Sequence, residues 1–169
     1  CIRDSLRRIA QYADLPKQRV LVSGSTGLIG LQLCAFLQAA GHEVVRLTRP
    51  STVLPPDVTD QPCVVWDDQT GEVLEGSLEG FDTVIHLAGA GIGDKRWNAE
   101  RKALIRSSRT VPTENLVRLF STLETPPKTL LSGSAVGYYG NRGDEQLTES
   151  SPAGDGFLSQ LAQDWDCLL

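Results

Sequence analysis

The segment SGSTGLIG, residues Ser23 to Gly30, joins a strand pattern to a helix pattern and decides the fold class. Before it, Arg19 to Ser23 (RVLVS) is an apolar run typical of a buried strand. After it, apolar residues recur at helical spacing from Leu28 to Ala40, and Gly41 is a suitable helix terminator. Glycine permits a tight turn and a close approach of the backbone to an anion, which the free amides of a helix N-terminus attract. The segment therefore predicts a phosphate-binding turn.

Strand and helix patterns alternate along the rest of the chain. Strand patterns cover His42–Thr48, Cys63–Trp66, Asp82–Leu87 and Lys128–Ser132, and helix patterns cover 98–109, 114–123 and 157–169. This alternation is typical of the α/β Rossmann fold, a doubly wound parallel sheet with helices on both faces, whose first glycine turn holds a dinucleotide. We therefore expect a dinucleotide site around Gly24, Gly27 and Gly30, the alternative being a glycine-rich turn that binds nothing. A P-loop NTPase is excluded because no Gly-Lys-Ser/Thr follows the turn.

The breaks between these patterns have identifiable causes. Residues Pro50 to Pro62 are rich in Pro, Ser, Thr and Asp and are expected to form a loop, and Asp67 to Gly71 has the composition of a turn. Asn98 is a candidate N-cap for the helix that follows it. Pro112 is expected to kink or interrupt that helix before the pattern resumes at residue 114.

Both ends of the chain lie in unfinished patterns. Residues 2–13 place apolar side chains at helical spacing, and Pro16 ends this pattern. The chain begins with Cys1 instead of Met and stops inside a helix pattern that has no C-cap signal. We therefore interpret it as a piece of a longer protein, with a helix and linker in residues 1–18 and a C-terminally truncated Rossmann domain in residues 19–169.

Composition excludes several classes of partner and site. The 169 residues are 40% hydrophobic and 22% charged, as in one globular domain, and a net charge of −5 gives no general attraction to nucleic acid or anionic membranes. No apolar stretch reaches the length of a membrane span, and no export signal precedes the first strand. The four cysteines lack the paired spacing of a zinc site or a disulfide framework. We expect a cytoplasmic protein without a bound metal.

The end of the second strand pattern indicates which dinucleotide binds. Units that bind NAD carry Asp or Glu about 20 residues after the glycines, to hold the ribose hydroxyls. This sequence has Thr48 and Arg49 there. The planar guanidinium of arginine pairs well with the 2′-phosphate of NADP. We therefore predict NADP(H) as the cofactor, the alternative being that Arg49 is a solvated surface residue.

Three further stretches carry a resemblance to a known family. They are HLAGAGIGDKRW (His86 to Trp97), Ser107 to Arg109, and SGSAVGYYGNRGDEQLTE (Ser132 to Glu149). With the G-x-x-G-x-x-G glycine motif, they resemble the NAD-dependent epimerase/dehydratase family of atypical, extended short-chain dehydrogenases/reductases, in the subgroup labelled epimerase family protein or cell-division inhibitor. The resemblance covers residues 19–169. Members continue into a C-terminal, substrate-binding half, and some carry an upstream lipid-binding-like domain, of which residues 1–18 would be the end.

The resemblance implies a cofactor site for NADP(H). Its residues would be Gly24, Ser25, Thr26, Gly27, Leu28, Ile29, Gly30, Thr48, Arg49, Leu87, Ala88, Gly89, Arg109 and Ser132. Independently, small residues at the end of a strand, as in Ala88-Gly89, suit the close passage of a dinucleotide. His86, at the end of the same strand, is expected to be a packed, hydrogen-bonded residue instead of a general base.

Catalytic residues are less clearly encoded. Ser134 matches the serine that contacts the substrate carbonyl in active members of the superfamily. Their Tyr-x-x-x-Lys pair should fall at Phe157 to Leu161, whose side chains cannot exchange protons. Tyr138 and Tyr139 are the nearby phenols able to replace it, although a pocket wall is the commoner role of such residues.

Two functions therefore remain open. The first is an NADP-dependent epimerase or oxidoreductase that transfers hydride to or from a sugar-like or small carbonyl substrate. The second is a non-catalytic NADP-binding redox sensor or scaffold, which the missing Tyr-x-x-x-Lys pair favours. The basic side chains between Lys95 and Arg109 either hold a phosphate of the cofactor or substrate, or form a solvated helix face.

Overall fold

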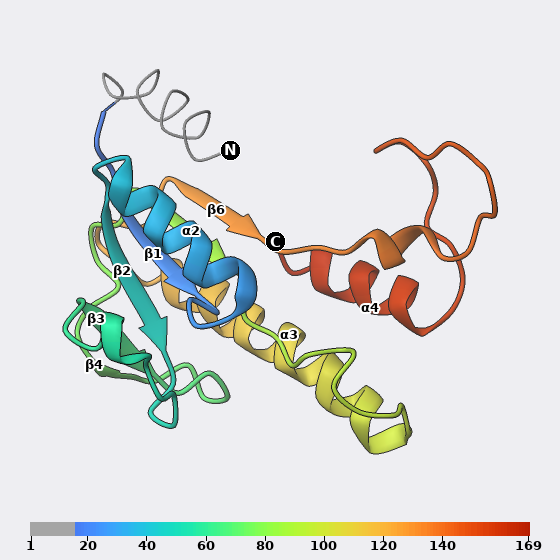
Figure 1. The fold of residues 1–169 in the computed structure, drawn as a ribbon, viewed down its shortest axis with the longest axis horizontal. Coiled ribbons are helices and arrows are strands. Elements are labelled where there is room, and N and C mark those ends of the chain that lie inside the picture. The colour runs from blue at the N-terminus through green and yellow to red at the C-terminus, as the bar shows by residue number, and fades with distance from the viewer. Residues whose placement is uncertain (1–15) are drawn as a thin grey trace.

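The computed structural model describes residues 16–169, which form a six-stranded sheet with helices on both faces (Figure 1). The strands are β1 (Arg19–Ser23), β2 (Glu43–Thr48), β3 (Cys63–Trp66), β4 (Val73–Glu75), β5 (Thr83–His86) and β6 (Thr129–Ser132). The helix expected over residues 2–13 lies outside the described residues.

The order of the strands fixes where a ligand can enter. Across the sheet the order is β4-β3-β2-β1-β5-β6, and every neighbouring pair is parallel except β3 with β4. From β1 the chain proceeds to one edge through β2 and β3, and later to the other edge through β5 and β6. The direction therefore reverses between β1 and β5, and sheets of this kind bind ligands outside the carboxyl ends of the strands at such a reversal.

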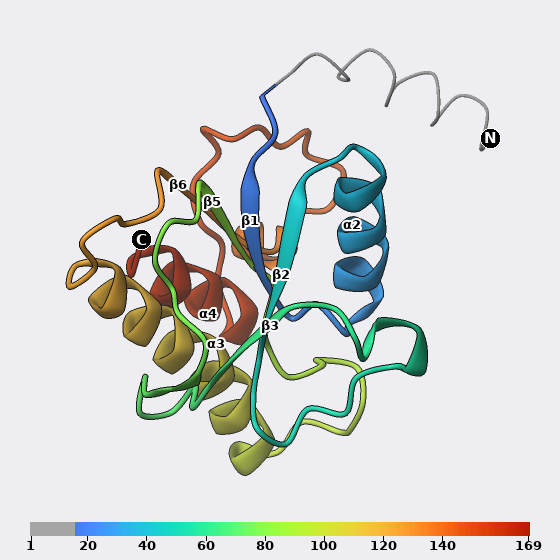
Figure 2. The same ribbon diagram turned by 90° about the vertical axis from the view of Figure 1, so that its left-hand side faces the viewer.

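Helices cover the two faces of the sheet unequally. Among the described residues the α-helices are α2 (Leu28–Ala39), α3 (Ala99–Phe120) and α4 (Phe157–Asp166), and the short 3-10 helices are η1 (Pro56–Val58) and η2 (Val136–Tyr139). Figure 2 shows α2 on one face and α3 with α4 on the other. The predicted helix limits at Gly41 and Asn98 are confirmed. Gly41 takes φ +86° just after the end of α2. The Asn98 side chain caps the start of α3, because it accepts a hydrogen bond from the Arg101 amide at 2.8 Å.

Two apolar layers hold the helices to the sheet. The layer beneath α2 contains Val20, Val22, Cys34, Val44 and Ile85. The larger layer on the α3 face contains Leu21, Val45, Leu47, Val64, Trp66, Leu78, Phe81, Val84 and Leu116. Alternate residues of β1 and β2 point into opposite layers, which is why these parallel strands read as continuous apolar runs in the sequence.

Two features differ from the sequence predictions. Strand β4 was not expected, because it is three residues long and lies in a turn-rich segment after Gly71. Pro112 was expected to kink or interrupt its helix, and the predicted interruption is wrong, because α3 is continuous across it. A proline removes a single N–H from the helix ladder. Here Pro112 is fully buried, and the Thr113 hydroxyl bonds the Arg109 carbonyl at 2.7 Å in the same turn, so packing holds the helix.

None of the described helices combines the length and the apolar character that crossing a bilayer requires.

Candidate functional site

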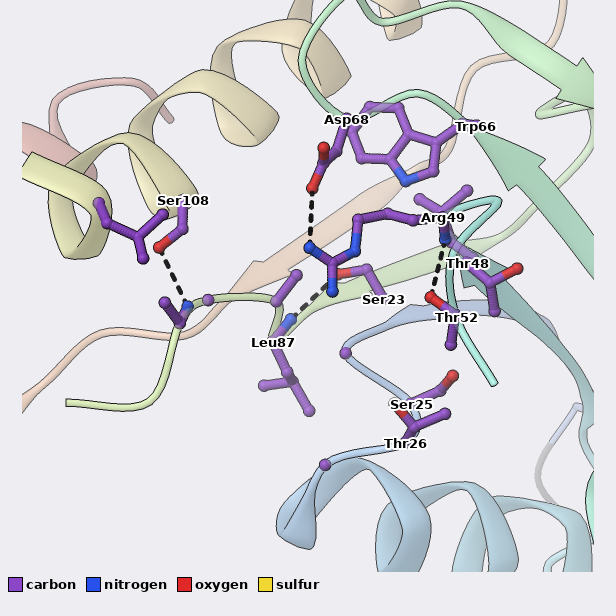
Figure 3. A pocket seen from close by; sticks show the side chains of 17 residues that line it. Ser23, Ser25, Thr26, Thr48, Arg49, Thr52, Trp66, Asp68, Leu87 and Ser108 are labelled. Carbon is purple, nitrogen blue, oxygen red and sulfur yellow. Dashed lines mark hydrogen bonds and ion pairs between the residues drawn. The ribbon is translucent and has the colours of Figure 1, made fainter. Parts of the chain in front are cut away.

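A cavity of about 390 Å³ opens at the carboxyl ends of the central strands, and we call it the glycine-turn cavity (Figure 3). Its lining comes from the β1–α2 turn, the ends of β2, β3 and β5, and two residues of α3. The lining residues are Ser23, Gly24, Ser25, Thr26, Gly27, Leu47, Thr48, Arg49, Thr52, Trp66, Asp68, Leu87, Ala88, Gly89, Ala90, Leu104 and Ser108. The cavity therefore lies at the reversal of strand order described above.

The glycines of the turn are required by close contacts between backbones. Gly24 takes φ +67°, and a Cβ atom there would lie 2.7 Å from the carbonyl carbon of Leu87. A Cβ on Gly30 would overlap the Gly24 carbonyl oxygen. The Gly27 amide donates to that same oxygen at 3.0 Å and closes the turn. The first turn of α2 is thereby held tightly against the end of β1, directly after the residues of the turn that line the cavity.

Polar and charged side chains line the cavity where β2 ends. The Arg49 amide donates to the Thr52 hydroxyl at 3.2 Å, which shapes the loop after Thr48. The Arg49 side chain is 61% exposed, and its Nη1 lies 3.9 Å from Oδ2 of Asp68. An ion pair this long and this exposed contributes little stability. The guanidinium is therefore available to a stronger anion that enters the cavity.

A buried hydrogen-bond chain ties the end of β5 to the turn. The Leu87 amide donates to Ser23 Oγ at 3.2 Å, and this hydroxyl lies 2.6 Å from His86 Nδ1. Within residues 16–169 the other ring nitrogen of His86, Nε2, is buried and has no hydrogen-bond partner. Burial lowers the pKa of His86 to about 4, so the ring is neutral near pH 7. The prediction of a packed, hydrogen-bonded His86 is confirmed.

Several predicted cofactor residues do not line this cavity. Leu28 and Ile29 point outward from α2, with exposed fractions of 89% and 67%. Gly30 lies behind the turn, where its lack of a side chain lets the helix pack against the Gly24 carbonyl. The Ser132 hydroxyl lies 3.4 Å from the neighbouring Gly133 carbonyl and belongs to the end of β6.

Arg109 braces the cavity without lining it. Its Nη1 donates to the Ala90 carbonyl at 3.1 Å and to the Ile105 carbonyl at 3.0 Å. Its guanidinium lies 5.5 Å from the centre of the Trp165 ring, and burial lowers its pKa from the usual range. The Ser108 hydroxyl accepts from the Ala90 amide at 3.0 Å, so both polar groups of Ala90 are held by α3.

Sequence reasoning missed two polar residues of the site, of which one is buried. Arg46 of β2 is 1% exposed and donates from Nη1 to the Ser25 carbonyl at 2.8 Å. Its signal in the sequence is a charged residue inside the apolar run EVVRLT. Ser108 lies in the Ser107 to Arg109 stretch that carries the family resemblance, but nothing in that stretch indicates the partner of its hydroxyl, which is 18 residues away in the chain.

The predicted catalytic residues surround a second cavity of about 820 Å³, which we call the Ser134 cavity. It is lined by Ser134, Ala135, Val136, Tyr138, Tyr139, Glu149, Gln163, Asp166 and Cys167. Ser134 Oγ donates to Asp166 Oδ2 at 3.3 Å, and the rings of Tyr138 and Tyr139 meet edge to face at 5.2 Å. The lining contains three hydroxyl-bearing residues and two carboxylates, and it contains no lysine or arginine.

The two cavities are both bordered by residues at the carboxyl ends of the neighbouring strands β5 and β6. The Gly133 amide donates to the His86 carbonyl at 2.8 Å, so Ser134 leaves β6 next to the point where Leu87 enters the glycine-turn cavity. A Cβ on Gly133 would lie 3.8 Å from the Leu87 side chain.

The basic side chains of α3 mostly contact neighbouring groups of the protein. Arg101 bonds the Gly91 carbonyl and lies 3.2 Å from Asp94, Arg106 pairs with Asp164, and Lys102 lies 5.4 Å from the centre of the Phe157 ring. These contacts hold the loop before α3, and α4 behind it. Lys95 and Arg96 are exposed.

Comparison with known proteins identifies the family. Residues 20–161 match the NAD dependent epimerase/dehydratase family. The chain belongs to this family. Among curated epimerase family proteins, ML0860 of Mycobacterium leprae is 37% identical over 150 residues, or 89% of this chain and 46% of that protein. The human epimerase family protein SDR39U1 is 33% identical over 88% of this chain and 47% of its own length, so the chain spans about half the length of these relatives.

Solved structures of epimerase family proteins share the fold. A nucleoside-diphosphate sugar epimerase from Corynebacterium glutamicum has a TM-score of 0.75 and 36% identity, over 98% of this chain and 34% of that one. Human SDR39U1, solved with NADPH, has a TM-score of 0.72 and 31% identity, over 89% of this chain and 48% of that one.

The residues present fit the dinucleotide of the epimerase family. The turn keeps its shape only with glycine at positions 24 and 30, because a Cβ at either would clash with neighbouring backbone atoms. Ser25 is a lining residue, and its Oγ is buried and has no partner in the described part of the chain. One exposed guanidinium and several small or hydroxyl-bearing residues complete the lining, which is the chemistry that phosphates and ribose require.

Proposed function

We propose that this chain provides the NADP(H)-binding part of an epimerase-like oxidoreductase. The observation that carries the proposal is the arginine at the end of β2. Arg49 lines the glycine-turn cavity together with Thr48 and Thr52, at the position where NAD-binding units carry a carboxylate. The NADPH in the structure of the human relative supports the same cofactor.

Each part of the glycine-turn cavity would bind a different part of the cofactor. The amides at the start of α2 would hold the pyrophosphate, and Arg49 would pair with the 2′-phosphate. Ala88 and Gly89 would leave room for the dinucleotide to pass toward β6. Asp68, which now faces Arg49 at 3.9 Å, would give up this weak ion pair when the phosphate arrives.

The Ser134 cavity would hold the substrate. Bound nicotinamide supplies hydride transfer at its ring. Ser134 would donate its hydroxyl proton to a hydrogen bond with the substrate oxygen, and Tyr138 or Tyr139 would exchange a proton with that oxygen. Since no lysine lines the cavity, nothing here would activate the phenol as Lys does in the Tyr-x-x-x-Lys pair.

We propose a sugar-like or small carbonyl substrate. The Corynebacterium glutamicum relative is described as a nucleoside-diphosphate sugar epimerase, which supports a sugar nucleotide. The size of the Ser134 cavity, about 820 Å³, also suits a molecule larger than a single small carbonyl compound.

A second candidate is a redox sensor or scaffold that binds NADP(H) without turnover. The observation in its favour is helix α4, whose first residues, Phe157 to Leu161, carry no group that can exchange a proton. In that case Tyr138 and Tyr139 would be pocket walls.

Turnover by the full-length protein separates the two candidates. We would measure NADPH oxidation or NADP⁺ reduction with a panel of sugar nucleotides and small carbonyl compounds. For an enzyme, Ser134→Ala and either Tyr138→Phe or Tyr139→Phe should lower kcat by about 100-fold, the size of general acid–base effects, with unchanged NADPH affinity. Ser150→Ala, in the exposed loop before α4, is the control and should have no effect. Absence of turnover with every substrate, alongside NADPH binding, would favour the sensor.

A further inference from the structure

Arg46 is a buried cation that lies directly behind the glycine turn. It is 1% exposed, on the face of β2 that packs against α2. Its Nη1 donates to the Ser25 carbonyl at 2.8 Å, and its Nε donates to Gln61 Oε1 at 3.1 Å. Gln61 in turn accepts from Gln38 of α2 at 3.2 Å. None of the ion pairs among the described side chains joins Arg46 to a carboxylate.

A buried charge without a counter-ion is unfavourable for the fold. Buried charges in proteins are normally paired or bound to an anion, because removing them from water costs several kcal/mol. Two neutral oxygens, from Ser25 and Gln61, offset only part of this cost. An anion close to Arg46 would therefore supply the negative charge that the described part of the protein does not.

Arg46 is linked to the glycine-turn cavity by the peptide between Ser25 and Thr26. Arg46 holds the carbonyl of Ser25, and in a planar trans peptide the next amide, that of Thr26, points the opposite way. Ser25 and Thr26 both line the cavity, whereas Arg46 does not. The Ser25 hydroxyl is buried next to the cavity and has no partner among the described residues. The cavity is thus bordered by an oriented peptide, with an unpaired hydroxyl and a positive charge behind it.

We propose that Arg46 is a positioning residue that sets the preference of the cavity for a dinucleotide with a 2′-phosphate. This inference rests on the proposed function. Arg46 orients the Ser25–Thr26 peptide and provides a positive potential, and the 2′-phosphate, which adds up to about two negative charges, is its counter-ion. Arg49 contacts the phosphate from the solvent side, and Arg46 acts on it through the turn. NADH lacks this phosphate, so the charge of Arg46 contributes less to its binding affinity.

Binding of NADPH and NADH to full-length variants tests the proposal. Arg46→Gln removes the charge but keeps an amide donor, and Arg46→Lys keeps the charge. We expect Arg46→Gln to weaken NADPH binding about 10-fold more than NADH binding, as expected for one charge at an effective dielectric constant near 20, and Arg46→Lys to restore most of the difference. Arg19→Met removes an equal charge at the opposite end of β1, and it should leave the ratio of the two affinities unchanged.

The outcomes distinguish this proposal from the proposed function. If the wild-type protein prefers NADPH and Arg46→Gln weakens both dinucleotides equally, Arg46 has only a structural role and the inference is wrong. If the wild-type protein has no preference for NADPH, the proposed cofactor is wrong and the inference fails with it. Should Arg46→Gln not fold, Arg46→Met, which removes the same charge without adding a buried amide, gives the same comparison.

Discussion

His86 makes the stability of this domain depend on pH, because its burial keeps the imidazole neutral. Its pKa is lowered to about 4 in the folded protein, against a usual value near 6.5. Between these values the unfolded chain binds a proton that the folded chain does not, so stability rises with pH in this window. We predict that the free energy of unfolding falls by about 3 kcal/mol as the pH is lowered from 6.5 to 4. Urea denaturation at several pH values measures it.

Two variants show whether His86 is the source of this dependence. His86→Gln should flatten the slope between pH 6.5 and 4, because the group that titrates is gone. His42→Gln removes the other histidine and should keep the slope. An unchanged slope in His86→Gln would mean that other groups cause the acid sensitivity.

At the scale of residues, the sequence predicted the positions that adjoin a strand end, and it missed those that meet only in space. Arg49 and Ala88-Gly89, which line the glycine-turn cavity, could be proposed from the sequence because each directly follows an apolar run. The contact between Arg46 and Ser25 depends on which face of β2 the side chain takes, and the contact between Ser108 and Ala90 depends on how α3 docks. Neither contact can be predicted from the spacing of residues along the chain.

Among the elements, the contact between α2 and the end of β1 is the most sensitive to substitution. A methyl group on Gly30 would overlap the Gly24 carbonyl and crowd the Ser25 backbone, neither of which can move without opening the turn. We predict that Gly30→Ala lowers the free energy of unfolding by about 3 kcal/mol and weakens NADPH binding more than 10-fold. Chemical denaturation and calorimetric titration measure the two effects.

Gly93→Ala is the matched control for this substitution. A Cβ at Gly93 meets no atom within 4 Å, in the loop before α3. The control should change neither stability nor binding by more than the experimental error. Equal behaviour of the two alanine variants would contradict the tight turn described for Gly30.

The helices and parallel strands were predictable because their patterns are long or bounded by clear signals. Strands β1, β2, β3, β5 and β6 are apolar runs that end within one residue of the predicted limits. Strand β4 escaped prediction because its three residues are too few to show a period. The continuity of α3 across Pro112 depends on tertiary packing against the sheet, which outweighs the local preference of proline.

For the whole molecule, helix α4 joins the Ser134 cavity to the rest of the domain, and Trp165 holds it there. The Trp165 indole donates to the Thr113 hydroxyl of α3 at 2.8 Å in a buried position. We predict that Trp165→Phe lowers the free energy of unfolding by about 1 to 2 kcal/mol, from the lost hydrogen bond and ring contacts. Thermal or urea unfolding measures the loss.

Trp97→Phe provides the comparison for Trp165→Phe. Trp97 also donates from its indole, to the Ile92 carbonyl at 2.7 Å, but its ring is 39% exposed. This substitution should cost less than about 0.5 kcal/mol, as is usual at the surface. A larger loss for Trp97 than for Trp165 would mean that α4 is not held through the buried indole.

The central claim is that the glycine-turn cavity binds NADP(H) through Arg49. The most direct measurement is calorimetric titration of the full-length protein with NADPH and with NADH, repeated with Arg49→Ala. We predict tighter binding of NADPH, a loss of about 10- to 100-fold in the variant, and little change for NADH, because the lost bonds are charge-assisted bonds to the 2′-phosphate. Equal affinities for the two dinucleotides in the wild-type protein, or binding of neither, would contradict the claim.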